Sequence, residues 1–330
     1  MKKILLIYIV FMSCTGGGIC QAEKMKQLVL TGPPVAETYP LYCMQEFEQL
    51  NNIADEIKFV PWDSTDQLRA MIVAGQVDYA ILTTASAAKF YNKGVPIRIV
   101  DVLYPSSLGV VSADPDIESI RDLKGTEVVL PFRPGDMPEV IFSVLMSGQG
   151  LVQGSDIRLR YVGSPMMAVQ LMLLGRAKNA FLSEPAISMA VYRSRLIEGK
   201  SPAPLLRKSI DIQHEWSEVY PEHPFIPLVA IAAVGNKAAM PEVVRPFRKA
   251  YRANASWCLK HPVETAKQFS VLFPGLCEKA VSENIKATCY RIEPAAEARG
   301  EINFFLNIVK AKNPACIGGK IPDENVIWKP

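Results

Sequence analysis

The sequence lacks the short motifs that mark common enzyme sites. Its three histidines form no His-Glu-x-x-His pattern, and its 330 residues contain neither a Gly-x-Ser-x-Gly elbow nor a Walker phosphate loop. No block of lysine and arginine stands out, and 36 basic residues nearly balance 33 acidic ones. No internal apolar run is long enough to cross a bilayer. We therefore expect no enzyme activity, no cofactor, no metal site and no nucleic-acid partner.

Cysteine spacing gives little support for a zinc or redox site, because the seven cysteines contain no Cys-x-x-Cys pair. Four cysteines lie near the C-terminus, where an oxidising compartment would permit disulfides: Cys258, Cys277, Cys289 and Cys316. Spacing alone leaves their pairing open. Cys43 stands apart from this group, and we expect it to be a small, buried, apolar residue.

Residues 1–22 have the pattern of an export signal, with a pair of lysines followed by an apolar stretch at residues 4–12. Two processing routes stay open. Residues 11–14 resemble a bacterial lipoprotein box, in which Cys14 would be lipidated and the glycines after it would form a flexible tether. Alternatively, ordinary signal peptidase cleavage would follow Ala22. Lipidation is the preferred hypothesis, and both routes predict a periplasmic or otherwise extracytoplasmic protein.

Two stretches of the chain coincide when one is shifted by 100 residues. Residues 64–75 and 164–175 each run from a serine to a glycine, and residues 80–83 and 180–183 then form short apolar runs that end in a hydroxyl residue. Each copy is typical of a capped helix, a glycine stop and a strand. The repeat favours two similar α/β lobes that face each other across a cleft, as the chain length also does.

The order of strand and helix signals predicts how the chain passes between these lobes. Alternating strands and helices, one of them a helix from about Tyr39 to Asn51, predict mostly parallel sheets flanked by helices. Irregular segments at residues 106–119 and 213–227 are interpreted as the two crossings. The predicted parts are residues 26–108 for the beginning of lobe 1, residues 109–227 for lobe 2, and residues 228–330 for the return to lobe 1 with C-terminal helices.

Four short motifs resemble, in their order, those of type II periplasmic binding proteins. They are VDYAIL at residues 77–82, KGVPI at 93–97, DLKG at 122–125 and SEPA at 183–186. The similarity is greatest to the ABC-transporter binding proteins for sulfonates, nitrate and thiamine precursors, and it covers roughly residues 26–275. That family usually has an acidic residue where Lys178 stands. The resemblance implies two lobes that close on a small polar or heterocyclic solute, and a membrane permease as partner.

Ligands of open α/β sheets bind beyond the carboxyl ends of the strands, where helix N-termini offer free N–H groups. This rule selects ten candidate ligand-binding residues: Thr31, Gly32, Trp62, Thr83, Thr84, Arg133, Asp136, Ser164, Ser183 and Glu184. Trp62 and Thr83 rank first, because an aromatic face with hydroxyl donors suits a planar or compact polar solute. Arg133 and Glu184 rank next, and a Glu184 beside Arg133 argues against a site built only for an inorganic anion.

Plainer interpretations accompany these candidates. Helix capping alone would explain Thr84, Asp136 and Ser164, and packing in a lobe core would explain Trp62. Two other functions also stay open. A secreted sensor that binds a solute and reports to a receptor would have the same fold. An enzyme resembling the thiamine-pyrimidine synthases is the other alternative, and the export signal argues against it because those relatives are cytoplasmic.

Overall fold

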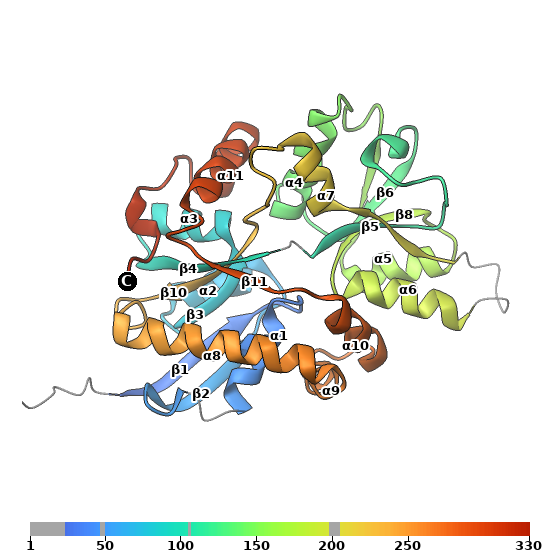
Figure 1. The fold of residues 1–330 in the computed structure, drawn as a ribbon. Helices are drawn as coiled ribbons and strands as arrows, with labels where there is room; N and C mark the ends of the chain where they lie inside the picture. The colour runs from blue at the N-terminus through green and yellow to red at the C-terminus, as the bar shows by residue number, and fades with distance from the viewer. Residues whose placement is uncertain (1–23, 47–49, 105–106, 198–204) are drawn as a thin grey trace, which may run out of the picture.

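The computed structural model describes residues 24–46, 50–104, 107–197 and 205–330, and it shows two lobes, each built on one β-sheet (Figure 1). The expected export signal and its Cys14 lie outside the described residues. Within the described part of the chain, every helix is too short or too polar to span a membrane.

The first lobe contains a six-stranded sheet in the order β11-β4-β10-β3-β1-β2. Its strands are β1 (Met25–Gly32), β2 (Ala54–Pro61), β3 (Tyr79–Thr83), β4 (Ile97–Tyr104), β10 (Val229–Val234) and β11 (Arg291–Pro294). Its helices are α1 (Thr38–Cys43), η1 (Met44–Glu46), α2 (Thr65–Val73), α3 (Thr84–Asn92), α8 (Pro241–Lys260), α9 (Pro262–Leu272), α10 (Glu278–Ala287), α11 (Arg299–Lys312), η4 (Pro314–Ile317) and η5 (Glu324–Val326). The long helix α8 crosses one face of this sheet (Figure 1).

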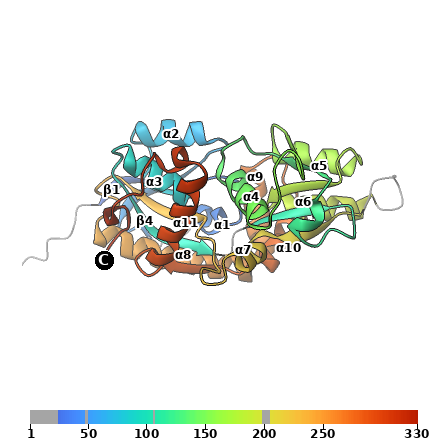
Figure 2. The same ribbon diagram turned by 90° about the horizontal axis from the view of Figure 1, so that it is seen from above.

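The second lobe contains a five-stranded sheet in the order β7-β6-β8-β5-β9. Its strands are β5 (Leu108–Ser112), β6 (Glu127–Leu130), β7 (Arg158–Tyr161), β8 (Asn179–Ser183) and β9 (Arg207–Asp211). Its helices are η3 (Ile120–Leu123), α4 (Met137–Gly148), α5 (Pro165–Leu173), α6 (Ala186–Leu196) and α7 (Ile212–Val219). Seen from above, α2 and α5 lie toward the same side of the molecule, one on each lobe (Figure 2).

Both sheets are mixed, and the reversed strands explain how the chain changes lobe. β5 pairs antiparallel with β8 and β9, and β10 pairs antiparallel with β3 and β4. β5 and β10 are each the first strand after the chain crosses from the other lobe. Each therefore enters its sheet at the edge where the parallel strands end, and it runs in the opposite direction to them. The predicted parallel pairing holds for β1 with β2 and β3, and for β6 with β7 and β8. The expected two-lobed α/β fold is confirmed.

The repeat of 100 residues corresponds to equivalent elements in the two lobes. Helices α2 and α5 begin alike: Ser64 Oγ accepts from the N–H of Gln67, and Ser164 Oγ accepts from the N–H of Met167, both at 3.2 Å. The glycine after each helix has a positive φ, which a residue with a side chain adopts only at a cost. The following strands β3 and β8 each lie between one parallel and one reversed neighbour. The two lobes therefore share a five-strand order.

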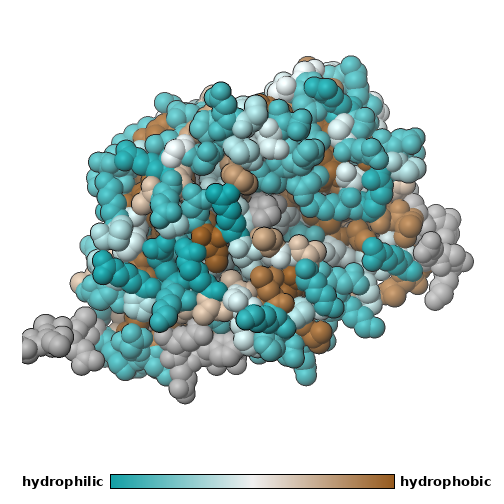
Figure 3. All heavy atoms as spheres, in the orientation of Figure 1, coloured by the Kyte–Doolittle hydropathy of each residue, from teal (hydrophilic) through white to brown (hydrophobic). Residues whose placement is uncertain are grey.

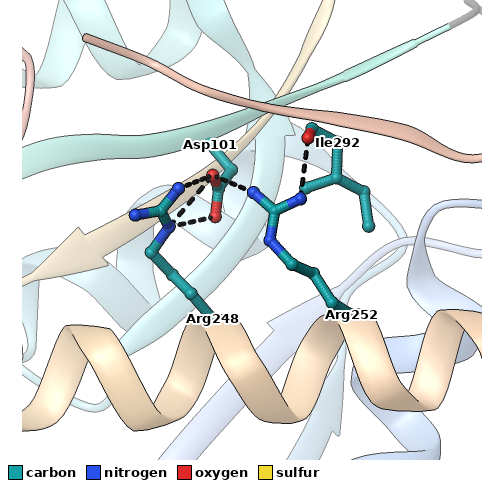
Figure 4. Close-up of polar contacts among 4 residues, drawn as sticks. All are labelled: Asp101, Arg248, Arg252 and Ile292. Carbon is teal, nitrogen blue, oxygen red and sulfur yellow. Dashed lines mark hydrogen bonds and ion pairs between the residues drawn. The ribbon is translucent and has the colours of Figure 1, made fainter. Parts of the chain in front are cut away.

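A buried ionic cluster joins α8 to the first sheet (Figure 4). Asp101 of β4 is 1% exposed, and its carboxylate accepts from Arg248 at 2.8–3.1 Å and from Arg252 at 3.1 Å. Arg252 also donates to the carbonyl of Ile292 in β11 at 2.7 Å. A buried carboxylate is stable only with such partners. Elsewhere, the face of the molecule drawn in Figure 3 is covered mostly by hydrophilic residues, as expected for a surface in contact with water.

Candidate functional site

The two lobes meet at Ser107, which directly precedes β5. Its hydroxyl donates to Glu37 Oε1 at 2.7 Å, and its carbonyl accepts from the backbone N–H of Glu184 at 2.8 Å. Glu37 is the N-cap residue of α1 in the first lobe, and Glu184 follows β8 in the second. One residue of the crossing segment therefore connects two acidic residues from opposite lobes.

Glu37 is the most unusual of these residues, because it is 4% exposed and only one of its oxygens is bound. Among the described residues, Glu37 Oε2 has no hydrogen-bond partner. Burial raises the pKa of its carboxyl, and the negative charge of Glu184 raises it further. The hydrogen bond from Ser107 opposes this shift in pKa only in part. Glu37 is thus a buried acid with an unused acceptor.

Glu184 has a similar electrostatic environment, although it is partly solvent-exposed. Burial raises its pKa, while hydrogen bonds from Ser188 and the positive charge of Lys208 oppose the shift. Its carboxylate accepts from the N–H of Ser188 in the first turn of α6 at 3.0 Å. A carboxylate at a helix N-terminus is stabilised by the free N–H groups there. The site therefore concentrates two acids with raised pKa values at the lobe junction.

Helix α1 is held against β1 by a close contact between Thr38 and Gly32. A Cβ built on Gly32 would lie 2.6 Å from Thr38 Oγ1, a distance that real side chains do not show. Thr38 is fully buried, and within the described chain its hydroxyl oxygen has no partner. Tyr251 of α8 donates to the carbonyl of Glu37 at 2.7 Å, and Tyr39 donates to Asn284 of α10 at 3.0 Å. Several elements therefore fix the direction of Glu37.

The threonine candidates of the first lobe differ in how their hydroxyls are used. Thr31 donates to the carbonyl of Val60 at 2.5 Å, and Thr84 donates to the carbonyl of Pro227, so both hydroxyls serve the fold. Thr83, rather than Thr84, caps α3: its Oγ1 accepts from the N–H of Ser86 at 3.1 Å. Thr83 is partly exposed. Its hydroxyl also donates to Ser86 Oγ at 2.8 Å, so Thr83 differs from the other two threonines in exposure rather than in having an unused hydroxyl.

Trp62 follows β2 and lies beside Gly32, whose carbonyl accepts from the Trp62 N–H at 3.3 Å. Its ring is partly buried and packs against the large apolar cluster that includes residues of both lobes. Its indole Nε1 is buried and finds no acceptor among the described residues. A buried indole N–H usually has a partner, so this unused donor sets Trp62 apart from the other candidates.

The candidates of the second lobe fall into separate contacts. Arg133 is exposed and pairs with Asp66 of α2 in the first lobe at 3.0 Å, and its backbone N–H donates to Asp136 at 2.8 Å. Ser164 caps α5, whereas Ser183 ends β8 and is partly buried next to Glu184. Arg133 therefore contributes an exposed ion pair that joins the second lobe to α2 of the first.

The sequence analysis missed Glu37 and Ser107. It placed the start of the first helix at about Tyr39, and α1 in fact begins at Thr38 with Glu37 at its N-cap. Candidate residues were sought directly after each strand. Extending that search along the loop after β1, as far as the N-cap residue of α1, would have included Glu37. Ser107 gave no signal, because its hydrogen bond to Glu37 joins positions 70 residues apart.

Other contacts between the lobes surround this junction. Helices α6 and α10 pack together, with Arg195 and Glu283 at 3.6 Å and the N–H of Cys277 at 3.1 Å from the sulfur of Met189. In the described ranges, no cluster of three histidine, cysteine or acidic side chains is arranged to hold a metal ion.

Comparisons with known proteins agree with this architecture. Residues 56–185, which are less than half of the chain, match the model of a family described as NMT1/THI5 like. A structure described as an ABC transporter from Parabacteroides distasonis has a TM-score of 0.72 at 20% identity, covering 92% of this chain and 99% of that one. No curated protein sequence matches the chain.

Two named binding proteins also match. The periplasmic aliphatic sulphonate binding protein SsuA of Escherichia coli has a TM-score of 0.70 at 15% identity, with 92% of each chain covered. The periplasmic nitrate-binding protein NrtA of Synechocystis PCC 6803 has a TM-score of 0.62 at 13% identity, covering 92% of this chain and 87% of that one. At such identities the likeness is one of fold. This chain has the two-lobed fold of periplasmic binding proteins, as its sequence resemblance implied, and these two matches are described as binding proteins rather than enzymes.

Proposed function

We propose that the protein is the extracytoplasmic solute-binding component of an ABC importer, which captures a small solute between its lobes and delivers it to a permease. The proposal is supported by a fold shared over almost the whole chain with proteins described in those terms. The observation that carries it is the contact of Ser107 with Glu37 of one lobe and Glu184 of the other.

The proposed ligand contacts come from both lobes. Trp62 would supply a ring and an unused indole N–H, the partly exposed Thr83 a hydroxyl, and Glu184 with Ser183 the acceptors of the second lobe. The remaining candidates, Thr31, Gly32, Thr84, Asp136, Ser164 and Arg133, shape or support this surface. A solute favours closure only through its difference in affinity between open and closed forms.

The charge at the junction indicates the class of solute. Two acids with raised pKa values, one with a free acceptor, favour a solute that carries hydrogen-bond donors or a positive charge. A simple anion would meet two carboxyl groups, and the cations Arg133 and Lys208 are already paired with Asp66 and Asp211. The solute would then differ in charge from sulphonate and nitrate, the ligands for which the two matched binding proteins are named.

A thermal-shift panel on the mature protein tests this function. Amine-bearing heterocycles, simple amines, alkanesulfonates and nitrate would be compared at equal concentration. A solute that binds only the folded protein raises its melting temperature in proportion to the logarithm of the ligand excess. We expect a rise with a donor-bearing solute and none with nitrate. A panel in which only the anions stabilise the protein would reject the proposed solute class.

Export and membrane attachment are part of the proposal. The N-terminal pattern supports secretion, with lipidation at Cys14 as the preferred route and cleavage after Ala22 as the alternative. Mass spectrometry of the protein from the membrane fraction separates the two: a lipidated N-terminal Cys14 supports the anchor, and an unmodified chain beginning at Glu23 rejects it. A sensor that uses the same fold would stimulate a receptor and bind no permease.

A further inference from the structure

Two cysteines far apart in the sequence are in contact in the core of the first lobe. Cys43 ends α1 and Cys258 lies in the last turns of α8, and their sulfur atoms are 3.6 Å apart. Both side chains are fully buried. They belong to an apolar cluster that also contains Tyr39 and Phe269. The pair is therefore held by helices on both sides and shielded from water.

The other described cysteines have different surroundings. Cys316 Sγ is 3.3 Å from the carbonyl oxygen of Gly135, Cys277 is partly buried near Met189, and Cys289 is exposed. The sequence placed the disulfide candidates among the four C-terminal cysteines and treated Cys43 as a small apolar residue. Cys43 is indeed buried, but the sulfur that Cys258 contacts belongs to Cys43 rather than to the C-terminal group.

We propose that Cys43 and Cys258 form a disulfide in the mature protein. The two thiols each lose a proton and together two electrons, an S–S bond forms, and a dithiol–disulfide oxidoreductase of the extracytoplasmic compartment accepts both as its own disulfide is reduced to two thiols. A disulfide needs a sulfur separation of about 2 Å, so the two sulfurs approach each other by about 1.6 Å. Rotation of the side chains and a small shift of the six-residue helix α1 supply this movement.

The reaction takes place during folding. Once α1 and α8 have packed, neither sulfur is accessible to an oxidant, and buried cysteines are inert. Oxidation therefore happens when α8 first meets α1, after the chain has been exported at least as far as Lys260. The proposal takes only the oxidising compartment from the proposed function, and its test does not depend on any solute.

The bond would stabilise the helix that carries the acidic site. It joins positions 215 residues apart, and a crosslink over so long a loop restricts the unfolded chain strongly. Helix α1 begins one residue after Glu37, and Tyr251 of α8 already binds the Glu37 carbonyl. The disulfide would fix the other end of the same short helix to the same partner. Glu37 would then keep its direction when the lobes separate.

Peptide mapping tests the bond directly. The full chain with its own signal is produced in a bacterial periplasm, purified without reductant, denatured in iodoacetamide and digested. We expect a linked pair of peptides that contain Cys43 and Cys258, and an intact mass about 2 Da below that of the reduced protein. Cys289 should be alkylated before and after reduction. Alkylation of both Cys43 and Cys258 before reduction would overturn the proposal.

Melting curves separate a disulfide from a packed pair of thiols. Cys43→Ala, Cys258→Ala and the double variant should lose the same amount, roughly 5–10 °C in melting temperature. A reductant should lower the melting temperature of the wild-type protein to that of the variants, and it should leave the melting temperatures of the variants unchanged. Cys289→Ala, the exposed control, should keep both the wild-type melting temperature and its response to reductant. A wild-type melting temperature that does not respond to reductant would contradict the bond, even if the alanine variants do not fold.

Discussion

The hydroxyl of Ser107 donates to the Glu37 carboxylate across 2.7 Å, and this bond joins the segment that enters the second lobe to helix α1 of the first lobe. The same residue accepts from the Glu184 N–H through its carbonyl. Any movement that separates the lobes must change at least one of these contacts. Ser107 is therefore a point at which solute binding and lobe position can be coupled.

The first prediction concerns the pH dependence of stability. Burial raises the pKa of Glu37 above its usual value of 4.5, so the folded protein holds this proton more tightly than the unfolded chain does. Stability from this group is complete below about pH 4.5 and is lost as the pH rises toward the raised pKa. Glu37→Gln removes that loss. Its stability relative to wild type should increase between pH 4 and neutral pH, as measured by thermal melts at each pH.

Asp66→Asn is the control of opposite sign. The pKa of the exposed Asp66 is lowered by its hydrogen bond with Arg133 and by the charge of Arg69, so its contribution is present above the usual pKa and is lost as the pH falls. The relative stability of this variant should therefore fall, weakly, as the pH rises from 3 to 5. Equal pH profiles for Glu37→Gln and wild type would show that Glu37 has an ordinary pKa.

The second prediction concerns the unused donor of Trp62. Trp62→Phe removes the indole N–H and keeps an aromatic ring, so the melting temperature without solute should change little. Affinity for the solute selected by the thermal-shift panel should fall by about fivefold, the loss of one hydrogen bond of about 1 kcal/mol. Calorimetric titration of wild type and variant measures this.

Trp328→Phe is the matched control for Trp62. Its indole N–H donates to the carbonyl of the partly buried Ala239 at 2.8 Å, so its removal takes away a hydrogen bond that serves the fold. This variant should lose stability, by about 1–3 kcal/mol, and keep its affinity for the solute. If Trp62→Phe behaves in this way instead, its N–H serves the fold, and Trp62 leaves the list of solute contacts.

The third prediction concerns the buried cluster of Asp101. Asp101→Asn leaves Arg248 and Arg252 without their carboxylate, and because these arginine side chains are 20% and 39% exposed, we expect a loss of about 1–3 kcal/mol. Denaturant unfolding measures this cost. Glu324, which also binds two cations but is about half exposed, is the control, and Glu324→Gln should leave the unfolding midpoint nearly unchanged. Similar losses in both variants would contradict the role given to burial.

The fourth prediction concerns the contact of Gly32 with Thr38. Gly32→Ala places a methyl group 2.6 Å from Thr38 Oγ1 and should destabilise the protein by about 1–3 kcal/mol. Gly163→Ala, where a Cβ meets open space, should have little effect. Removing the opposing atoms with Thr38→Ala should restore part of the loss. If the double variant is as unstable as the sum of the single variants, the two residues are not in contact.

The sequence predicted what depends on local chemistry. Serine caps and glycine stops define α2 and α5, and their equal spacing predicts two lobes from the sequence alone. Strand signals carry no direction, so the reversal of β5 and β10 was not foreseen. The site was predicted least well, because the contacts of Glu37 with Ser107 and of Cys43 with Cys258 join positions 70 and 215 residues apart.

Small-angle X-ray scattering of the mature protein tests the central claim, that the lobes close on a solute. The measurement compares the protein alone, with the solute that gives the largest thermal shift, and with nitrate at the same concentration. The account predicts that the solute lowers the radius of gyration, that nitrate does not, and that Glu184→Gln weakens the effect at limiting solute. A solute that binds by calorimetry and leaves the radius of gyration unchanged, or a panel from which nothing binds, would contradict it.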